Sequence, residues 1–252
     1  MKIIFSEAPP DYATYTFPYA IYAMQENEEE IPAIYDRGFL PYTDTRFRLP
    51  EAPFYYLARS IRIRLEDFAL TSENRRIRRK MESLAPRMHV TSKAPWRDNE
   101  AFWQFCRRYA AGRIGEAMSS ARLQYIFDHP LTNRLFVFEN NEGPLGYVWA
   151  VDRPPVLHYW FAFYDTRYLP QGLGKWMMEQ VISYARQAGY RYVYLGTCYG
   201  SKALYKVRDF RAVEYFDGNG WHTDIKRLKA RCREDDREFR WDEWKALHRV
   251  ED

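Results

Sequence analysis

Residues 156–195, VLHYWFAFYDTRYLPQGLGKWMMEQVISYARQAGYRYVYL, decide the fold. The aliphatic and aromatic run at 156–164 predicts a strand, and the glycine-containing loop at 171–174 opens a helix. Gly189 ends that helix, and residues 190–195, rich in Tyr and Val, predict a second strand. Strand, loop, helix and strand in this order form a βαβ-type unit.

The segments on either side extend this unit. Upstream, two helices are predicted, the first capped by Asp98 or Asn99 and the second ending near Phe127. Three strands then form an antiparallel meander, at 134–139, 145–151 and 156–164. Downstream, the predicted elements are a short helix and a strand, at 202–207 and 210–216.

The first 90 residues have a different pattern. Residues 61–65 alternate strictly, which places three aliphatic side chains on one face of a strand and Arg62 and Arg64 on the other. Ser72 can cap the helix that follows. Proline-containing segments near residue 90 indicate a boundary. We therefore predict an α+β protein, with a small N-terminal α+β domain at 1–90, a second domain with a central mixed sheet at 91–225, and a charged tail or docking helix at 226–252.

Composition excludes several classes of protein. No run approaches the ~18 to 20 apolar residues that span a bilayer, and the first residues lack a signal-peptide core. We therefore expect a cytoplasmic protein with no membrane partner. The net charge of +4 identifies no partner by itself. The three cysteines have no paired spacing and the five histidines no ligand spacing, so we expect buried thiols and no metal.

The order of elements at 96–221 resembles the GNAT acyltransferase domain. In that superfamily a Q-x-x-G-x-G/A loop at a helix start offers backbone N–H groups to the pyrophosphate of acyl-CoA. The loop here contains Gln171, Gly172 and Gly174, but Trp176 replaces the last small residue, and its bulk would obstruct a pyrophosphate. The alternative is that the glycines only begin a helix.

Three further stretches resemble the aminoacyl-tRNA-protein transferases, the family of arginyl- and leucyl-tRNA-protein transferases. Residues 68–80 are similar to their F-x-x-S-x-x-Q-R-R-x-x-K segment. Residues 160–165, followed by 172–174, resemble Y-F-Y-D-P...S-L-G-x-Y, and residues 194–210 resemble Y-L-G-Y-x-I...C-x-K-M-x-Y-K...F. The three partial matches occur in the order that the family has.

The sequence also departs from this family. Its members carry a cysteine cluster, which binds a metal or an iron–sulfur centre, just before the strand expected at 61–65. Residues 41–60 contain no cysteine here, so no metal or other cofactor is expected. Asn74 stands in place of the family's Gln, and Thr166 in place of its Pro. These differences indicate a divergent branch.

The resemblance implies an enzyme that moves arginine or leucine from aminoacyl-tRNA to the N-terminal α-amine of an acceptor protein. The reaction is aminolysis of an ester, and an α-amine with a pKa of ~7.7 to 8 needs only a modest base. Tyr205 is the candidate acid for the departing ribose hydroxyl, with Lys202 and Lys206 near enough in sequence to lower its pKa; alternatively, Tyr205 only packs. The candidates for substrate binding are Gln171, Gly172, Gly174, Trp176, Tyr164 and Lys202.

A basic segment provides the candidates for tRNA binding, which are Arg75, Arg76, Arg78, Arg79 and Lys80. Together with Arg62 and Arg64 they would suit tRNA phosphates, and they would equally attract acidic N-terminal residues of an acceptor protein. The alternative is a solvated helix face. Two other functions stay open: a GNAT N-acyltransferase that uses acyl-CoA, and an inactive homologue that binds tRNA or peptide.

Overall fold

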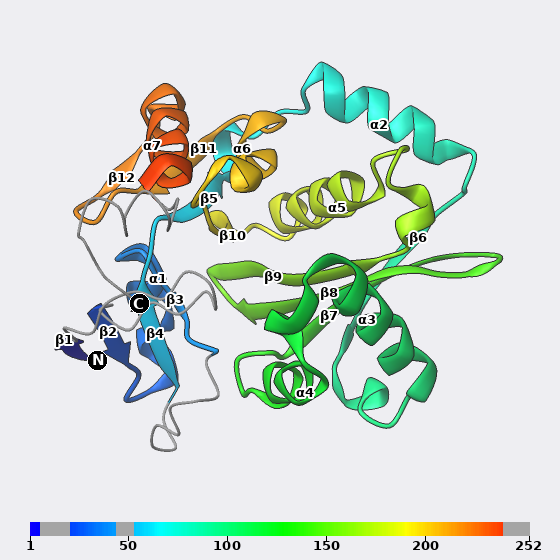
Figure 1. Ribbon diagram of the computed structural model, residues 1–252, viewed down its shortest axis with the longest axis horizontal. Coiled ribbons are helices and arrows are strands. Elements are labelled where there is room, and N and C mark those ends of the chain that lie inside the picture. The colour runs from blue at the N-terminus through cyan, green and yellow to red at the C-terminus, as the bar shows by residue number, and fades with distance from the viewer. Residues whose placement is uncertain (6–20, 44–52, 239–252) are drawn as a thin grey trace, which may run out of the picture.

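The computed structural model describes residues 1–5, 21–43 and 53–238. Two β-sheets organise these residues (Figure 1). The larger sheet has eight strands in the order β12-β11-β5-β10-β9-β8-β7-β6. In chain order these strands are β5 (Ser60–Arg64), β6 (Arg87–Ser92), β7 (Arg134–Asn140), β8 (Gly143–Arg153), β9 (Val156–Tyr164), β10 (Tyr192–Thr197), β11 (Val213–Phe216) and β12 (Trp221–His222).

The larger sheet is mixed, as predicted. Its neighbouring strands are antiparallel except β9 and β10, which run parallel. Helix α5 (Leu173–Gln187) connects these two strands, which confirms the βαβ unit. The strand predicted at 156–164 coincides with β9.

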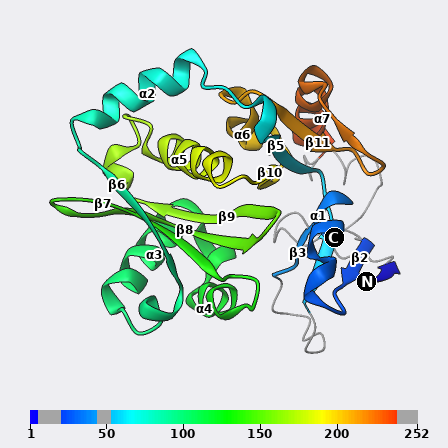
Figure 2. The ribbon, with the colours of Figure 1, turned by 180° about the vertical axis from the view of Figure 1, so that it is seen from behind.

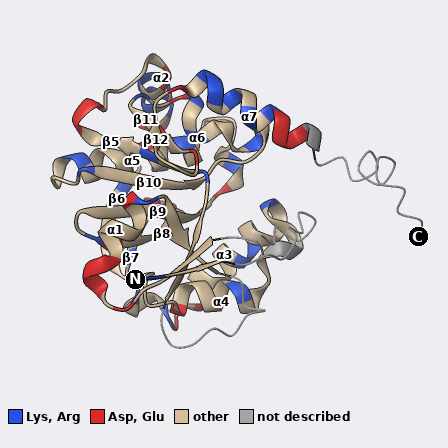
Figure 3. Cartoon of the chain, turned by 90° about the vertical axis from the view of Figure 1, so that its left-hand side faces the viewer, with Lys and Arg blue, Asp and Glu red and all other residues tan. Residues whose placement is uncertain are grey.

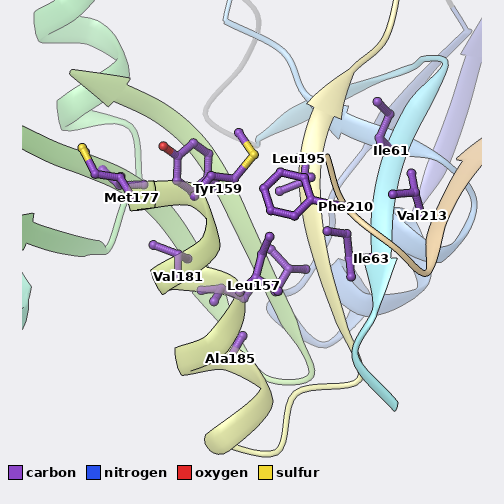
Figure 4. Close-up of a cluster of buried hydrophobic side chains, with 14 of the residues drawn as sticks. Ile61, Ile63, Leu157, Tyr159, Met177, Val181, Ala185, Leu195, Phe210 and Val213 are labelled. Carbon is purple, nitrogen blue, oxygen red and sulfur yellow. The ribbon is translucent and has the colours of Figure 1, made fainter. Parts of the chain in front are cut away.

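Helices cover both faces of the larger sheet (Figures 1 and 2). α2 (Ser72–Glu82) lies beside α5 on one face, and α3 (Glu100–Arg113) and α4 (Ser120–Asp128) cover the other. Each face has its own hydrophobic core. The core under α5 includes Val181 and Ala185 of that helix, Leu157 of β9 and Ile63 of β5 (Figure 4).

Side-chain caps set the start of two of these helices. Asn99 caps α3, as one of the two predicted candidates, and its side chain accepts a hydrogen bond from the backbone N–H of Phe102 at 3.0 Å. The cap of α2 is Thr71, not Ser72. Thr71 Oγ1 accepts from the backbone N–H of Asn74 at 3.1 Å, and the Asn74 side chain accepts from the backbone N–H of Thr71 at 2.9 Å. Asn74 therefore closes a capping box.

Strand β5 belongs to the first 90 residues and yet lies inside the larger sheet. It pairs with β10 on one side and with β11 on the other. Ile61 and Ile63 point into the core under α5, and burial of their apolar surface stabilises this placement of β5. The division at residue 90 stays a prediction, and the pairing joins the two sides of it through hydrogen bonds.

Arg62 corrects the expectation of a basic sheet face. Only 5% of its surface is exposed, because the guanidinium lies between the rings of Tyr192 and Trp221. Arg62 Nε donates to Glu214 at 2.7 Å and a terminal nitrogen donates to Asp36 at 2.8 Å. Arg62 is thus a buried structural cation, covered by elements far away in sequence.

A smaller sheet of four strands, in the order β1-β2-β4-β3, was not predicted. Its strands are β1 (Lys2–Phe5), β2 (Ile21–Met24), β3 (Phe39–Pro41) and β4 (Phe54–Leu57), with helix α1 (Ile31–Asp36) beside them. Residues Ile31, Ile34 and Tyr35 of α1 are buried in a third core, which also includes Tyr194 of β10. That core joins the smaller sheet to the larger one.

The predicted tail begins with helix α7 (Ile225–Glu238). Leu228 and Cys232 are fully buried, and the Arg59 guanidinium holds Asp235 through two hydrogen bonds of 2.6 and 3.0 Å. Residues 239–252, the rest of that tail, lie outside the described residues. In the parts of the chain that the structure describes, the helices are too short or too polar to cross a bilayer.

Candidate active site

The two parallel strands β9 and β10 separate part-way along their length. Their ladder ends where Tyr194 lies opposite His158. Just beyond, each strand carries one extra residue: Trp160 in β9 relative to β8, and Leu195 in β10 relative to β5. Bulges of this kind turn side chains and end pairing. A cavity of about 490 Å³ opens where the strands separate, and both extra residues line it.

The cavity brings together elements from both faces of the sheet. Its lining includes Tyr109, Arg113 and Ile114 from the end of α3, residues 159–162 and Tyr164 of β9, Gly172, Gly174, Lys175 and Met178 around the start of α5, Leu195 of β10, and Tyr205 and Lys206. Within the described residues, β9 has no strand beside it on this edge after His158. Backbone N–H groups of that edge can therefore stabilise negative charge that develops in the cavity.

The start of α5 is a tightly packed glycine turn. Gly172 is the N-cap and has φ +91°, a conformation that favours glycine. A Cβ at Gly172 would approach Ile77 of α2 to 3.4 Å, and a Cβ at Gly174 would come within 2.7 Å of the Tyr164 ring. Both glycines are thus explained by the backbone conformation and by neighbouring side chains of the protein.

Four of the seven residues predicted to act on the substrates line the cavity: Tyr164, Gly172, Gly174 and Tyr205. Gln171, Trp176 and Lys202 are not among the lining residues. Trp176 is only 7% exposed and packs edge-on against Phe138, with 5.5 Å between ring centroids. The expectation that its bulk obstructs the loop is therefore wrong, because the ring lies in the core.

Tyr205 opens the short helix α6 (Tyr205–Arg208) and keeps 44% of its surface accessible. Burial of its hydroxyl, and then the nearby Tyr164, raise the pKa of Tyr205 to about 12. The predicted lowering by two lysines is wrong: Lys202 is exposed, and the Lys206 ammonium donates to the backbone carbonyl of Thr197 at 2.9 Å. Tyr205 is consequently a protonated phenol at neutral pH, which suits a proton donor.

The residues that sequence reasoning missed come from α3. Tyr109 stacks obliquely on Tyr164 with 4.7 Å between ring centroids, and Arg113 follows one helical turn later. Nothing in the local sequence marks them, since they meet the cavity only through packing of α3 under β9. Lys206 is a further lining residue, and burial lowers its pKa.

A family model described as an acetyltransferase (GNAT) domain matches residues 71–207. The chain belongs to the GNAT family. The matched segment begins at the cap of α2 and ends in α6, so it contains every element that lines the cavity. The GNAT-like fold predicted from the sequence is confirmed.

Curated relatives lie among the aminoacyl-tRNA-protein transferases, which confirms that resemblance. A protein of Cereibacter sphaeroides named aspartate/glutamate leucyltransferase is 28% identical over 173 residues, 64% of this chain and 60% of that one. A protein of the same name from Parvibaculum lavamentivorans is 29% identical over 172 residues, 65% of this chain and 69% of its own. The match to the first relative thus spans well under two thirds of that relative's length.

The solved structures that resemble the GNAT chain have lower sequence identity to it than the curated relatives do. L-PGS from Bacillus licheniformis has a TM-score of 0.45 at 14% identity and covers 71% of this chain and 55% of its own. FemX has a TM-score of 0.43 at 9% identity, with coverage of 74% and 65%. Scores below 0.5 establish no shared site or activity.

The cysteine chemistry of the aminoacyl-tRNA-protein transferases does not fit these residues. Cys106 is buried in α3, far in sequence from Cys198 and Cys232, whose Sγ atoms lie 3.6 Å apart. Among the described side chains, no three His, Cys, Asp or Glu gather as metal ligands would. No step of the reaction is therefore assigned to a metal or an iron–sulfur centre.

The basic segment of the GNAT chain lies on α2, whose arginines and lysine are blue in Figure 3. The Arg78 guanidinium forms a bidentate pair with Glu179 of α5 at 2.8 and 2.6 Å. Arg76 pairs with Glu73, and Arg75 donates to the Leu70 carbonyl. Arg79 and Lys80 are exposed, and neither makes an ion pair with a described side chain.

Two buried histidines make stability depend on pH. Burial lowers the pKa of His158 to about 3 and that of His129 to about 4. In the unfolded chain these histidines bind protons near pH 6.5, whereas in the folded protein they stay neutral until the pH is much lower. The folded state is therefore most stable above pH 6.5, and it loses stability as the pH falls towards 4 for His129 and towards 3 for His158. We expect the free energy of unfolding, measured by urea titration, to fall by about 2 kcal/mol per histidine between pH 7 and pH 5.

A comparison of variants separates the contribution of the histidines to the pH dependence of unfolding from that of the carboxylates. His129→Asn should reduce the pH dependence of the free energy of unfolding by the contribution of one histidine. Equal pH dependence in the wild type and His129→Asn would contradict the assignment.

Proposed function

We propose that this protein transfers leucine from leucyl-tRNA to the α-amine of a protein N-terminus whose first side chain is acidic. The observation that carries the proposal is the cavity at the separated strands, where an apolar wall, a protonated phenol and the covered glycine turn lie together. The name that the relatives share, aspartate/glutamate leucyltransferase, supports the same donor and acceptor.

The lining of the cavity favours leucine over arginine as the donated residue. Its apolar side chains include Ala162, Leu169, Met178 and Leu195. Its charged side chains, among the described residues, are the cations Arg113, Lys175 and Lys206. An aliphatic side chain gains free energy by burial on this wall, whereas a guanidinium would find no acidic side chain among the lining residues.

The geometry supports a direct attack of the amine on the ester. The aminoacyl carbonyl lies at the separated strands, where backbone N–H groups of β9 stabilise the oxyanion. The amine nitrogen forms the new C–N bond and loses its proton to solvent. The C–O bond to the ribose breaks, and Tyr205 gives its proton to the leaving oxygen. Because the α-amine has a pKa near ~8, a useful fraction of it, about a tenth, is already neutral near pH 7.

Acyl-CoA is a poorer donor for this site. The two glycines that would let a pyrophosphate approach the backbone have the Tyr164 ring and the Ile77 side chain against them. Lys175, at the same helix start, already forms an ion pair with Asp209. The protein's own side chains thus account for both glycines and for Lys175, without a pyrophosphate.

The test supplies the full chain with labelled leucyl-tRNA or arginyl-tRNA and with peptides that begin with Asp, Asn or Lys. We expect label from leucyl-tRNA in the Asp peptide, and at least tenfold less from arginyl-tRNA. Acetyl-CoA should not raise the Tm, although a ligand at 100 times its Kd stabilises a protein by ~2.7 kcal/mol.

The other outcomes point to the other functions. Transfer from arginyl-tRNA alone would reverse the donor, and acetyl transfer with a raised Tm would indicate an acyl-CoA enzyme. Binding of tRNA or peptide without transfer of label would leave an inactive homologue.

A further inference from the structure

We propose that Arg113 binds the carboxylate of the acceptor's N-terminal side chain and thereby selects acidic acceptors. The inference rests on the proposed aminoacyl transfer and assigns its acceptor specificity to one residue. Arg113 is the last residue of α3, on the sheet face opposite to α5, and it lines the cavity beside Tyr109 and Ile114.

We place the donor ester beside Tyr205 and the acceptor peptide at the end of α3, on two elements that both line the cavity. The ribose oxygen leaves beside the Tyr205 hydroxyl, so the body of the tRNA lies outside the α6 end. The acceptor peptide must then enter by a part of the cavity that the tRNA leaves open. The end of α3 supplies such a part, with Tyr109, Arg113 and Ile114 along it.

Arg113 is also the available cation of the lining. Lys175 pairs with Asp209, and the Lys206 ammonium donates to the Thr197 carbonyl. Arg113 is exposed, and no described side chain forms an ion pair or a hydrogen bond with it. A planar guanidinium with free donors binds a carboxylate through two parallel hydrogen bonds, which an ammonium cannot do.

Arg113 lies near the pair of tyrosines that lines the cavity. Its charge acts on Tyr109, where it opposes the raising of the pKa of Tyr109 by burial. Tyr109 in turn stacks on Tyr164, the ring that covers Gly174. A carboxylate held at Arg113 would therefore lie beside this tyrosine pair, with the neighbouring α-amine directed into the cavity.

The experiment compares peptides that differ only in the first residue, Asp or its neutral isostere Asn. The measured quantity is the ratio of kcat/KM for the two peptides, with leucyl-tRNA as donor. Hydrogen bonds to charged groups contribute enough that Arg113→Ala should reduce this ratio about 10- to 100-fold. Arg113→Lys should keep part of the preference, and Arg113→Glu should shift it towards a peptide that begins with Lys.

Arg108→Ala is the matched control, because Arg108 is an exposed arginine of the same helix that does not line the cavity. It should leave the ratio unchanged. If Arg113 acts only through its favourable interaction with the dipole of α3, Arg113→Ala should change the Tm and leave the ratio unchanged. An unchanged ratio in a folded Arg113→Ala protein overturns the proposal.

Calorimetric binding of the Asp and Asn peptides separates this inference from the proposed function. If the wild type transfers nothing but binds the Asp peptide more tightly, and Arg113→Ala abolishes the difference, the binding site stands and the reaction is wrong. If the wild type transfers leucine and Arg113→Ala keeps the full preference for Asp, the reaction stands and the role of Arg113 is wrong.

Discussion

Tyr205→Phe is expected to lower kcat for leucyl transfer by about 100- to 10,000-fold, the range that a general acid contributes. The substitution removes one hydroxyl and keeps the ring, so packing and the Tm should change little. Because the ribose oxygen leaves as an alkoxide without a proton donor, the loss should appear in kcat and not in KM for leucyl-tRNA. Single-turnover transfer to an Asp peptide measures it.

The pH profile adds a second signature of the same residue. The rate should rise as the acceptor amine loses its proton near pH ~8, and it should fall only as the Tyr205 hydroxyl ionises, with its pKa raised to about 12. Tyr184→Phe is the control, because that ring packs on Phe136 away from the cavity. A Tyr205→Phe enzyme with near-normal kcat and a lowered Tm would mean that Tyr205 only packs.

Arg78→Ala is expected to lower the free energy of unfolding by about 2–4 kcal/mol, since breaking a buried ion pair leaves one charge without its partner. The carboxylate of Glu179 is only 1% exposed, and Arg78 supplies its only cationic partner among the described residues. The lower part of the usual range applies because Arg78 stays in contact with water and the Ser183 hydroxyl still donates to Glu179 at 2.6 Å. Urea denaturation measures the change.

Arg79→Ala, on the next residue of the same helix, provides the matched control. Its stability should stay within ±0.5 kcal/mol of the wild type, as for an exposed position without a partner. Binding of tRNA should show the reverse order: Arg79→Ala reduces the salt slope by about one, and Arg78→Ala leaves it unchanged. If Arg78→Ala flattens the salt slope while stability is unchanged, Arg78 contacts tRNA and its pair with Glu179 is incidental.

Sequence reasoning succeeded where the signal is local. The apolar run of β9, the glycine turn and the helix that follows are each marked by residue types within a few positions of one another. Both ends of β9 were therefore predicted correctly. The strands of the smaller sheet have only three or four residues, too few for any period. β6 is an edge strand in which only Met88 and Val90 contact the core, between exposed Arg87 and His89, so its apolar pattern is too short to detect.

Long-range packing explains the errors. Strict alternation correctly predicted that Arg62 and Ile63 face opposite sides of β5, but it cannot reveal that α1 and β12 cover the arginine side. Trp176 was within reach of the sequence, because it continues the buried stripe of Leu173 and Met177 along α5. Tyr109 and Arg113 could not be predicted as site residues from the sequence, since only the packing of α3 against the sheet brings them to the cavity with Gly172 and Gly174.

The central position of β5 has a consequence for synthesis on the ribosome. Its two neighbours in the sheet, β10 and β11, are translated roughly 130 to 150 residues later. At a translation rate of ~5 to 20 residues per second, both partner strands are complete only on the order of ten seconds after Ile61 and Ile63 are synthesised. During that time the nascent chain presents an unpaired apolar strand, so we expect this protein to depend on chaperones that shield such segments until translation is nearly complete.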